Sequence, residues 1–131
     1  MAETSPWVAI VDDDASVLKA LARLLRVRGL EVRTYTSARD FLAALHDGLL
    51  PECLILDLQM PETNGLELQH QLILNRVHIP TIIITANNEP GTRDRCRAAG
   101  AMAFLTKPLQ ETLLFTAIEE ARGALRDDVR I

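Results

Sequence analysis

Short apolar or alternating runs recur five times along this chain, and longer segments whose apolar residues recur every three or four positions separate them. The runs are Trp7–Val11, Glu31–Tyr35, Cys53–Leu56, Thr81–Ile84 and Ala103–Leu105. Continuously apolar strands are typical of parallel sheets that helices cover on both faces. Right-handed crossovers leave only a few arrangements for such units. We therefore predict an α/β fold with a doubly wound, five-stranded parallel sheet.

The length and composition fit one domain of this class. The chain has 131 residues, of which 48% are hydrophobic, enough for a single core. We expect a domain at residues 1–126 and a C-terminal tail, or the start of a linker, at residues 127–131. No apolar run approaches the roughly 20 residues of a membrane helix, and no leader pattern precedes the first strand. We expect a cytoplasmic protein without membrane contact, and its net charge of −4 argues against direct nucleic-acid binding by this domain.

Polar side chains stand where the predicted strands end. They are Asp12–Asp14 after the first run, Asp57 after the third, Thr85 after the fourth and Lys107 after the fifth. In open parallel sheets, ligands bind at the carboxyl ends of the strands. One aspartate, most plausibly Asp14, is explained by the preference of acidic residues for a helix N-terminus. The remaining groups predict a site at this edge of the sheet.

Carboxylates gathered at one edge would repel each other unless a cation lies between them. Mg²⁺ prefers oxygen ligands, usually one or two carboxylates together with water. Asp13 and Asp57 are candidates for direct ligands, and Asp12 for a ligand that binds directly or through a water. Lys107 supplies a compact positive charge that suits a carboxylate or a phosphoryl oxygen. The residues thus predict a Mg²⁺ site beside a lysine.

These groups suit phosphoryl transfer to a protein carboxylate. A phosphoryl group in transfer spreads negative charge over its oxygens, so the protein has mainly to position it and to stabilise that charge. Mg²⁺, Lys107 and the Thr85 hydroxyl can each serve one oxygen. Asp57 is the best candidate for the nucleophile, because it stands alone after a buried strand, and attack by its carboxylate would form an aspartyl phosphate.

Several motifs, in order and each at a strand end, resemble one family. They are Ile10–Asp13, Leu54–Pro61 followed by Gly65, Ile83–Ala86, Gly100–Ala101 and Phe104–Pro108. Together they are similar to the receiver domains of bacterial two-component response regulators, over about Trp7 to Arg122. The resemblance implies a flavodoxin-like sheet of order 2-1-3-4-5. It also implies a phosphoprotein of phosphorelay signal transduction, which promotes its own phosphorylation and dephosphorylation rather than turning over a separate substrate.

The resemblance also assigns roles to individual residues. Asp57 is implied as the phosphoacceptor, and Asp12 and Asp13 as the acidic pair that holds Mg²⁺ with the backbone carbonyl of Gln59. Gln59 departs from the commoner family pattern. It stands two positions after the phosphoacceptor, beside the path of the hydrolytic water, and Asn87 holds the matching position two after Thr85. These two amides leave the lifetime of the phosphoryl group open.

A conformational switch is also implied. Thr85 would contact the phosphoryl group, Lys107 would pair with it, and the Lys107–Pro108 bond is expected to be cis. Phe104 resembles the aromatic switch residue, whose ring turns inward when Thr85 moves. The surface from about Arg93 to Ala117 is then the expected output face.

The resemblance implies partners as well. A sensor histidine kinase would donate the phosphoryl group, and the output face would control an output domain or a partner protein, with a homodimer on phosphorylation as a further expectation. Thr34–Tyr35 and Ser37–Leu42 look like receivers that precede a LuxR-type DNA-binding domain, which suggests transcription regulation.

Two other functions stay open. Asp12–Asp14 can be read as the D-x-D start of a haloacid-dehalogenase-type phosphatase with Asp12 as nucleophile. Against this, no acidic pair follows Lys107, and the pattern around Asp57 would be unexplained. The second alternative is a receiver-like binding module that no longer accepts phosphate. Such modules usually lose an acid, the lysine or the hydroxyl, and all are present here.

Overall fold

Five strands and five helices alternate along the chain. The computed structural model describes residues 7–45, 48, 50–60, 63–86 and 89–129. The strands are β1 (Trp7–Val11), β2 (Glu31–Tyr35), β3 (Cys53–Asp57), β4 (Thr81–Thr85) and β5 (Ala103–Thr106). The helices are α1 (Ala15–Val27), α2 (Ala38–Leu45), α3 (Gly65–Leu74), α4 (Thr92–Ala98) and α5 (Glu111–Val129). Within these residues, no helix is long and apolar enough to cross a membrane.

The sheet has the predicted order. The strands lie β2-β1-β3-β4-β5, and every neighbouring pair is parallel. β1, β3 and β4 are central and buried along their full lengths, which explains why their sequences are continuously apolar. β2 lies at an edge, where Glu31, Arg33 and Thr34 are exposed, and its sequence alternates accordingly.

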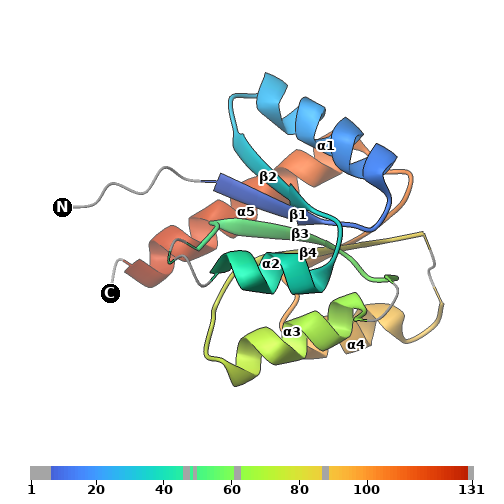
Figure 1. Ribbon diagram of the computed structural model, residues 1–131, viewed down its shortest axis with the longest axis vertical. Coiled ribbons are helices and arrows are strands. Elements are labelled where there is room, and N and C mark those ends of the chain that lie inside the picture. The colour runs from blue at the N-terminus through green and yellow to red at the C-terminus, as the bar shows by residue number, and fades with distance from the viewer. Residues whose placement is uncertain (1–6, 46–47, 49, 61–62, 87–88, 130–131) are drawn as a thin grey trace.

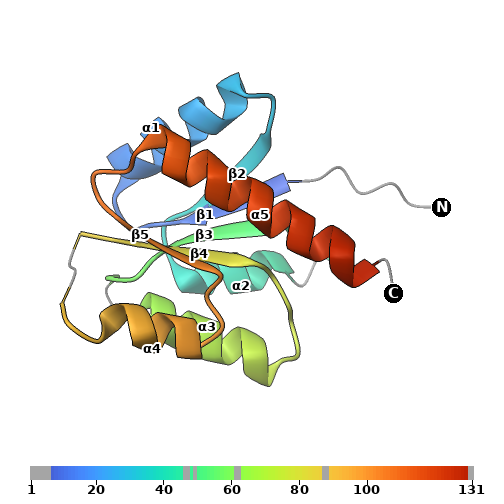
Figure 2. The same cartoon turned by 180° about the vertical axis from the view of Figure 1, so that it is seen from behind.

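Helices cover both faces of the sheet. α1 and α5 lie on one face, and α2, α3 and α4 lie on the other (Figure 1). The view from behind shows α5 running across the first of these faces (Figure 2). Alternate residues of a strand point to opposite faces, so Val8 and Ile10 of β1 join the core beneath α1 and α5, while Ala9 and Val11 join the core on the other face. The sheet thus separates two apolar clusters, and its polar groups remain at its edge.

Local hydrogen bonds start two helices beside the strand ends. The carboxylate of Asp14 caps α1 by accepting from the backbone N–H groups of Ser16 and Val17. Asn64 and Glu67 form a capping box at the start of α3. Asp14 therefore has the helix-capping role that its position suggested, which leaves Asp12 and Asp13 for the site.

α4 is shorter than its sequence indicated. The sequence, in which Gly100 supplies a stop, predicts a helix from about Pro90 to Ala99, whereas the helix spans Thr92–Ala98. The cause is Gly91, whose φ of +84° is left-handed and cannot continue a right-handed helix. No side chain caps this N-terminus. At the other end of the chain, α5 continues to Val129, so the division between a domain at 1–126 and a tail at 127–131 stays a prediction.

Candidate functional site

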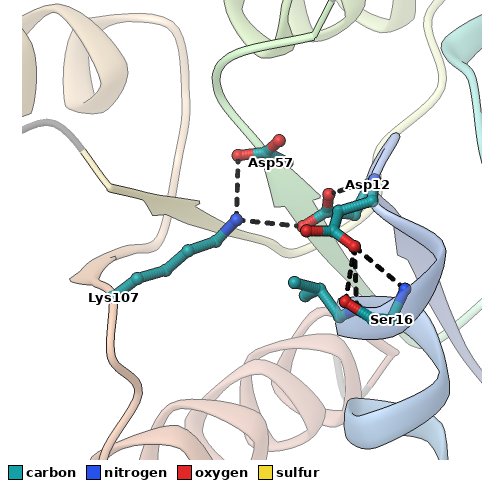
Figure 3. Close-up of polar contacts among 6 residues, drawn as sticks. Asp12, Ser16, Asp57 and Lys107 are labelled. Carbon is teal, nitrogen blue, oxygen red and sulfur yellow. Dashed lines mark hydrogen bonds and ion pairs between the residues drawn. The ribbon is translucent and has the colours of Figure 1, made fainter.

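The carboxyl edge of the sheet brings together side chains from three separate strands. Asp12 directly follows β1, Asp57 is the last residue of β3, and Lys107 directly follows β5. Figure 3 shows the Lys107 side chain reaching between the carboxylates of Asp12 and Asp57. The parallel register places these positions at the same edge, although up to 95 residues of sequence separate them. Their convergence was predicted from the sequence.

Three carboxylates form an acidic cluster. One oxygen from each of Asp12, Asp13 and Asp57 lies within 4.8 Å of the others. Asp12 and Asp57 are buried, at 0% and 4% exposure, whereas Asp13 is exposed. Buried carboxylates are costly unless they are paired, and oxygen donors in this arrangement suit a hard divalent cation. The cluster is therefore an acidic pocket that could bind a metal ion.

Lys107 is the cation that the fold itself brings to this cluster. Its Nζ lies 3.2 Å from Oδ2 of Asp12 and 3.6 Å from Oδ1 of Asp57. Its backbone N–H donates to the carbonyl of Thr85 at 2.8 Å, which holds the residue beside the end of β4. The peptide bond between Lys107 and Pro108 is cis, as expected. One lysine against three carboxylates leaves the pocket negatively charged.

The protonation of the pocket reflects this imbalance. Burial, together with the charge of Asp12, raises the pKa of Asp57 from 3.8 to about 6, although Lys107 opposes the shift. Burial lowers the pKa of Lys107, but the charges of Asp57 and Asp12 outweigh it and raise that pKa above 10.5. Lys107 thus stays positively charged, but its charge alone does not compensate the negative charge of Asp57 and its neighbours. An added cation would relieve this shortage.

Two further predicted site residues, Thr85 and Gln59, lie beside this pocket. Thr85 ends β4 and is fully buried. Gln59 is exposed, and its backbone N–H donates to the Asp57 carboxylate. Asn87 lies outside the described residues, so its expected place beside the hydrolytic water stays a prediction.

Phe104 lies on β5, next to Ile83 of β4, and its ring is only half-buried. The guanidinium of Arg93, on α4, lies 5.3 Å from the ring centroid. Sequence reasoning named both residues as part of one surface but did not predict this contact. No spacing rule could have found it, because the turn between α4 and β5 decides how the two approach.

A second feature that sequence reasoning missed is the close approach of Gly65. A Cβ on this residue would lie 2.9 Å from the carbonyl oxygen of Asp57 and 3.0 Å from Cα of Leu58. The backbone N–H of Gly65 donates to the carbonyl of Leu58 at 2.9 Å. The start of α3 therefore packs directly on the backbone that carries Asp57. The sequence signal was a glycine at a fixed distance after Asp57, and its steric role needed the structure.

Comparison with known proteins matches this geometry to one family. The family model described as the response regulator receiver domain matches residues 8–119. Response regulator protein TmoT of Ectopseudomonas mendocina is 41% identical over 87% of this chain and 51% of its own length. Transcriptional regulatory protein FixJ of Rhizobium meliloti is 38% identical over 90% of this chain and 57% of its own length.

A solved structure shares the fold. The crystal structure of FixJ-N superposes with a TM-score of 0.84, is 36% identical, and covers 92% of this chain and 96% of that one. The chain spans about half the length of the curated relatives it matches. The similarity therefore concerns the receiver domain and not the remaining parts of those longer proteins.

Proposed function

Because this chain belongs to the response regulator receiver domain family, we propose that it is a signalling switch whose Asp57 accepts a phosphoryl group from a sensor histidine kinase. The position of Asp57 supports its role as the phosphoacceptor. Its buried carboxylate ends a central strand, 3.6 Å from Lys107 and beside the carboxylates of Asp12 and Asp13. A carboxylate placed in this way can act as a nucleophile and form a covalent intermediate.

The acidic pocket suits Mg²⁺ as the metal. Asp12, Asp13 and Asp57 supply oxygen donors close together, and the backbone carbonyl of Gln59 would complete the protein's share. When bound, Mg²⁺ supplies positive charge that offsets the carboxylates and the phosphoryl oxygens. The raised pKa of Asp57, which reflects a buried charge without enough compensation, supports this assignment.

The chain's own residues would position the phosphoryl group. One oxygen of Asp57 attacks phosphorus, so that an O–P bond forms while the N–P bond of a phosphohistidine donor breaks and leaves its electron pair on nitrogen. Lys107 turns from Asp12 and Asp57 toward a phosphoryl oxygen, and the Thr85 hydroxyl donates to another. Such donors stabilise the charge that spreads over the phosphoryl oxygens during transfer. The receiver thereby promotes its own phosphorylation, and water flanked by Gln59 and Asn87 would later hydrolyse the aspartyl phosphate.

The signal would leave through the edge of the sheet that β5 forms. As Thr85 moves toward the phosphoryl group, the Phe104 ring turns into the space it vacates. The surface formed by α4, β5 and α5 changes shape and contacts an output domain or a partner protein. The likeness to a transcriptional regulatory protein supports an output in transcription regulation. For this output we propose a LuxR-type DNA-binding domain and a homodimer formed on phosphorylation. All of this would take place in the cytoplasm, where a kinase domain can reach Asp57.

Intact mass after incubation with acetyl phosphate and Mg²⁺ tests this function. We expect one added phosphoryl group on the wild type, and none without Mg²⁺ or on Asp57→Ala. Asp14→Asn is the matched control, because it changes a neighbouring aspartate but keeps a residue able to cap α1. It should be phosphorylated like the wild type.

A phosphomonoesterase assay, together with the intact-mass measurement, separates the two alternatives. Turnover of a phosphomonoester that survives Asp57→Ala and is lost in Asp12→Ala would establish a phosphatase instead. No added mass on a folded wild type that binds Mg²⁺ would establish a binding module that does not accept phosphate.

A further inference from the structure

An arginine from another element lies over the ring of Phe104. Arg93 stands in the first turn of α4, and its guanidinium carbon lies 5.3 Å from the centroid of the ring. Both residues line a small hollow of about 140 Å³, which Leu113 of α5 also lines. A guanidinium within about 6 Å of a ring face attracts it through the ring's quadrupole. The half-buried Phe104 ring thus packs partly on the core and also has the cation of Arg93 over it.

Arg93 has no competing carboxylate among the residues that the structure describes. Two other arginines stack on rings, Arg28 on Phe115 and Arg33 on Trp7, but each also pairs with a glutamate. No ion pair in the described parts of the chain involves Arg93. The ring of Phe104 is therefore the specific contact that orients this guanidinium.

The helix that carries Arg93 is lightly attached. α4 has seven residues, no side-chain cap at its N-terminus, and two buried side chains, Thr92 and Cys96. Arg93 itself is exposed. Its contact with Phe104 can therefore be made or lost without disturbing the core, which is what a reversible hold on the ring requires.

We propose that Arg93 is a positioning residue that holds the Phe104 ring outward and thereby opposes phosphorylation of Asp57. This inference rests on the proposed function, in which the ring turns inward as Thr85 moves. A contact made only in the outward state stabilises that state alone, and so lowers the population that accepts the phosphoryl group readily. Arg93 would thus set the equilibrium between the outward and inward positions of the ring without contacting the phosphoryl group.

The size of the effect follows from the strength of an exposed cation–π contact. Losing it should raise the inward population, and with it the rate of phosphorylation, by about two- to fivefold. Arg93→Ala should therefore react with acetyl phosphate faster than the wild type. Arg97→Ala is the matched control, because Arg97 is an exposed arginine of the same helix and makes no ring contact in the described structure. It should react at the wild-type rate.

A double-mutant cycle separates this role from a merely structural one. In a Phe104→Leu background the ring is gone, so adding Arg93→Ala should leave the rate unchanged. The same acceleration in both backgrounds would overturn the proposal, and so would a rate for Arg93→Ala equal to or below that of Arg97→Ala.

The position of the ring can be followed without any phosphorylation. The chain has three phenylalanines, so 4-fluorophenylalanine labelling gives three fluorine resonances, and Phe104→Leu identifies one of them. In unphosphorylated Arg93→Ala this resonance should move toward its position in the wild type saturated with Mg²⁺ and beryllofluoride, which mimics the phosphoryl group. An unmoved resonance would overturn the proposal. If the wild type itself took up neither phosphoryl group nor beryllofluoride, the proposed function would fail instead.

Discussion

The aspartates of this chain behave differently because their surroundings differ. Asp14 is exposed and accepts hydrogen bonds from Ser16 and Val17, which lower its pKa. Asp57 is buried beside Asp12, and the pKa of its carboxyl rises to about 6. An aspartate side chain thus stabilises the start of a helix at position 14, whereas at position 57 it carries a buried charge that is unfavourable. The uncompensated negative charge at Asp57 favours the binding of a cation.

Asp57→Asn should stabilise the metal-free protein at neutral pH. Because folding raises the pKa of Asp57 from 3.8 to about 6, its contribution to stability is full below pH 3.8 and is lost as the pH rises through 6. At pH 7.5 in EDTA we expect the variant to unfold with a free energy about 1–2 kcal/mol above the wild type. Urea denaturation at pH 4 and pH 7.5 measures the difference, which should nearly vanish at pH 4.

Two comparisons make that result specific. Asp13→Asn is the control, because Asp13 is exposed, and it should change stability little in EDTA. Saturating Mg²⁺ should narrow the gap between Asp57→Asn and the wild type, since a bound ion stabilises the protein that binds it better. A wild type more stable than Asp57→Asn in EDTA at pH 7.5 would show that Lys107 fully compensates the buried charge.

Gly65→Ala should displace the backbone that carries Asp57. The new Cβ would meet the Asp57 carbonyl oxygen at 2.9 Å, and both nearest atoms belong to the backbone, which cannot swing aside. We expect a loss of about 1–3 kcal/mol in stability and slower phosphorylation of the folded protein. Gly123→Ala is the control: nothing lies within 4 Å of its Cβ, and alanine in a helix should add up to about 1 kcal/mol. Equal stabilities of the two variants would refute the steric argument.

At the scale of elements, the two helices nearest the site differ in how firmly they are attached. α3 has a capping box and buries Leu68 and Leu72. The N-terminus of α4 has no side-chain cap and is preceded by a glycine with left-handed backbone geometry. After the C-terminus of α4, the side-chain amide of Gln69, on α3, donates to the carbonyl of Ala99. α4 is thus the less firmly anchored of the two helices. A loosely attached element is easily repositioned when its neighbours change.

Amide hydrogen exchange should show this difference. We expect the amides of α4 to exchange at least about tenfold faster than the central amides of α3, because opening α4 breaks fewer contacts. Saturation with Mg²⁺ and beryllofluoride should change protection in α4 and β5 more than in α2, which serves as the internal reference. A change confined to the loop after Asp57 would argue against an output surface at α4, β5 and α5.

At the scale of the whole molecule, one ion pair ties the last helix to the far end of the central sheet. Nε of Arg122, on α5, lies 2.7 Å from Oε1 of Glu52, directly before β3. Both atoms are buried and have no further hydrogen-bond partner in the described structure. The polar site at one end of β3 and this pair at the other thus bracket an apolar strand. The pair thus joins α5 to the segment that enters β3.

Arg122→Ala should destabilise the whole domain. Without the arginine, Glu52 keeps a largely buried carboxylate and loses its partner, which should cost about 1–3 kcal/mol. Glu119→Ala is the control, because it removes only the exposed partner of Arg122, 68% accessible and 3.5 Å away, and should cost less than about 0.5 kcal/mol. Thermal unfolding of both variants measures the difference. Equal losses of stability in the two variants would mean that the buried pair of Arg122 and Glu52 makes no separate contribution to stability.

The sequence by itself determined the strands, their parallel arrangement and which strand-end residues come together. Buried strands read as continuous apolar runs, and chemistry in such sheets lies at the strand ends, so Asp12, Asp57 and Lys107 could be named from their positions. Asp14 could likewise be set apart as a cap, because a cap depends on neighbours in sequence.

Only the tertiary structure decided how these parts meet. The late start of α4 follows from the backbone of Gly91, and the contact of Gly65 with Asp57 follows from how α3 packs on β3. The hold of Arg93 on Phe104 depends on the turn between α4 and β5. Hydrophobic periodicity and the positions of strand ends can be recognised from neighbouring residues in the sequence. These contacts, in contrast, join residues whose distance in space depends on how the elements pack.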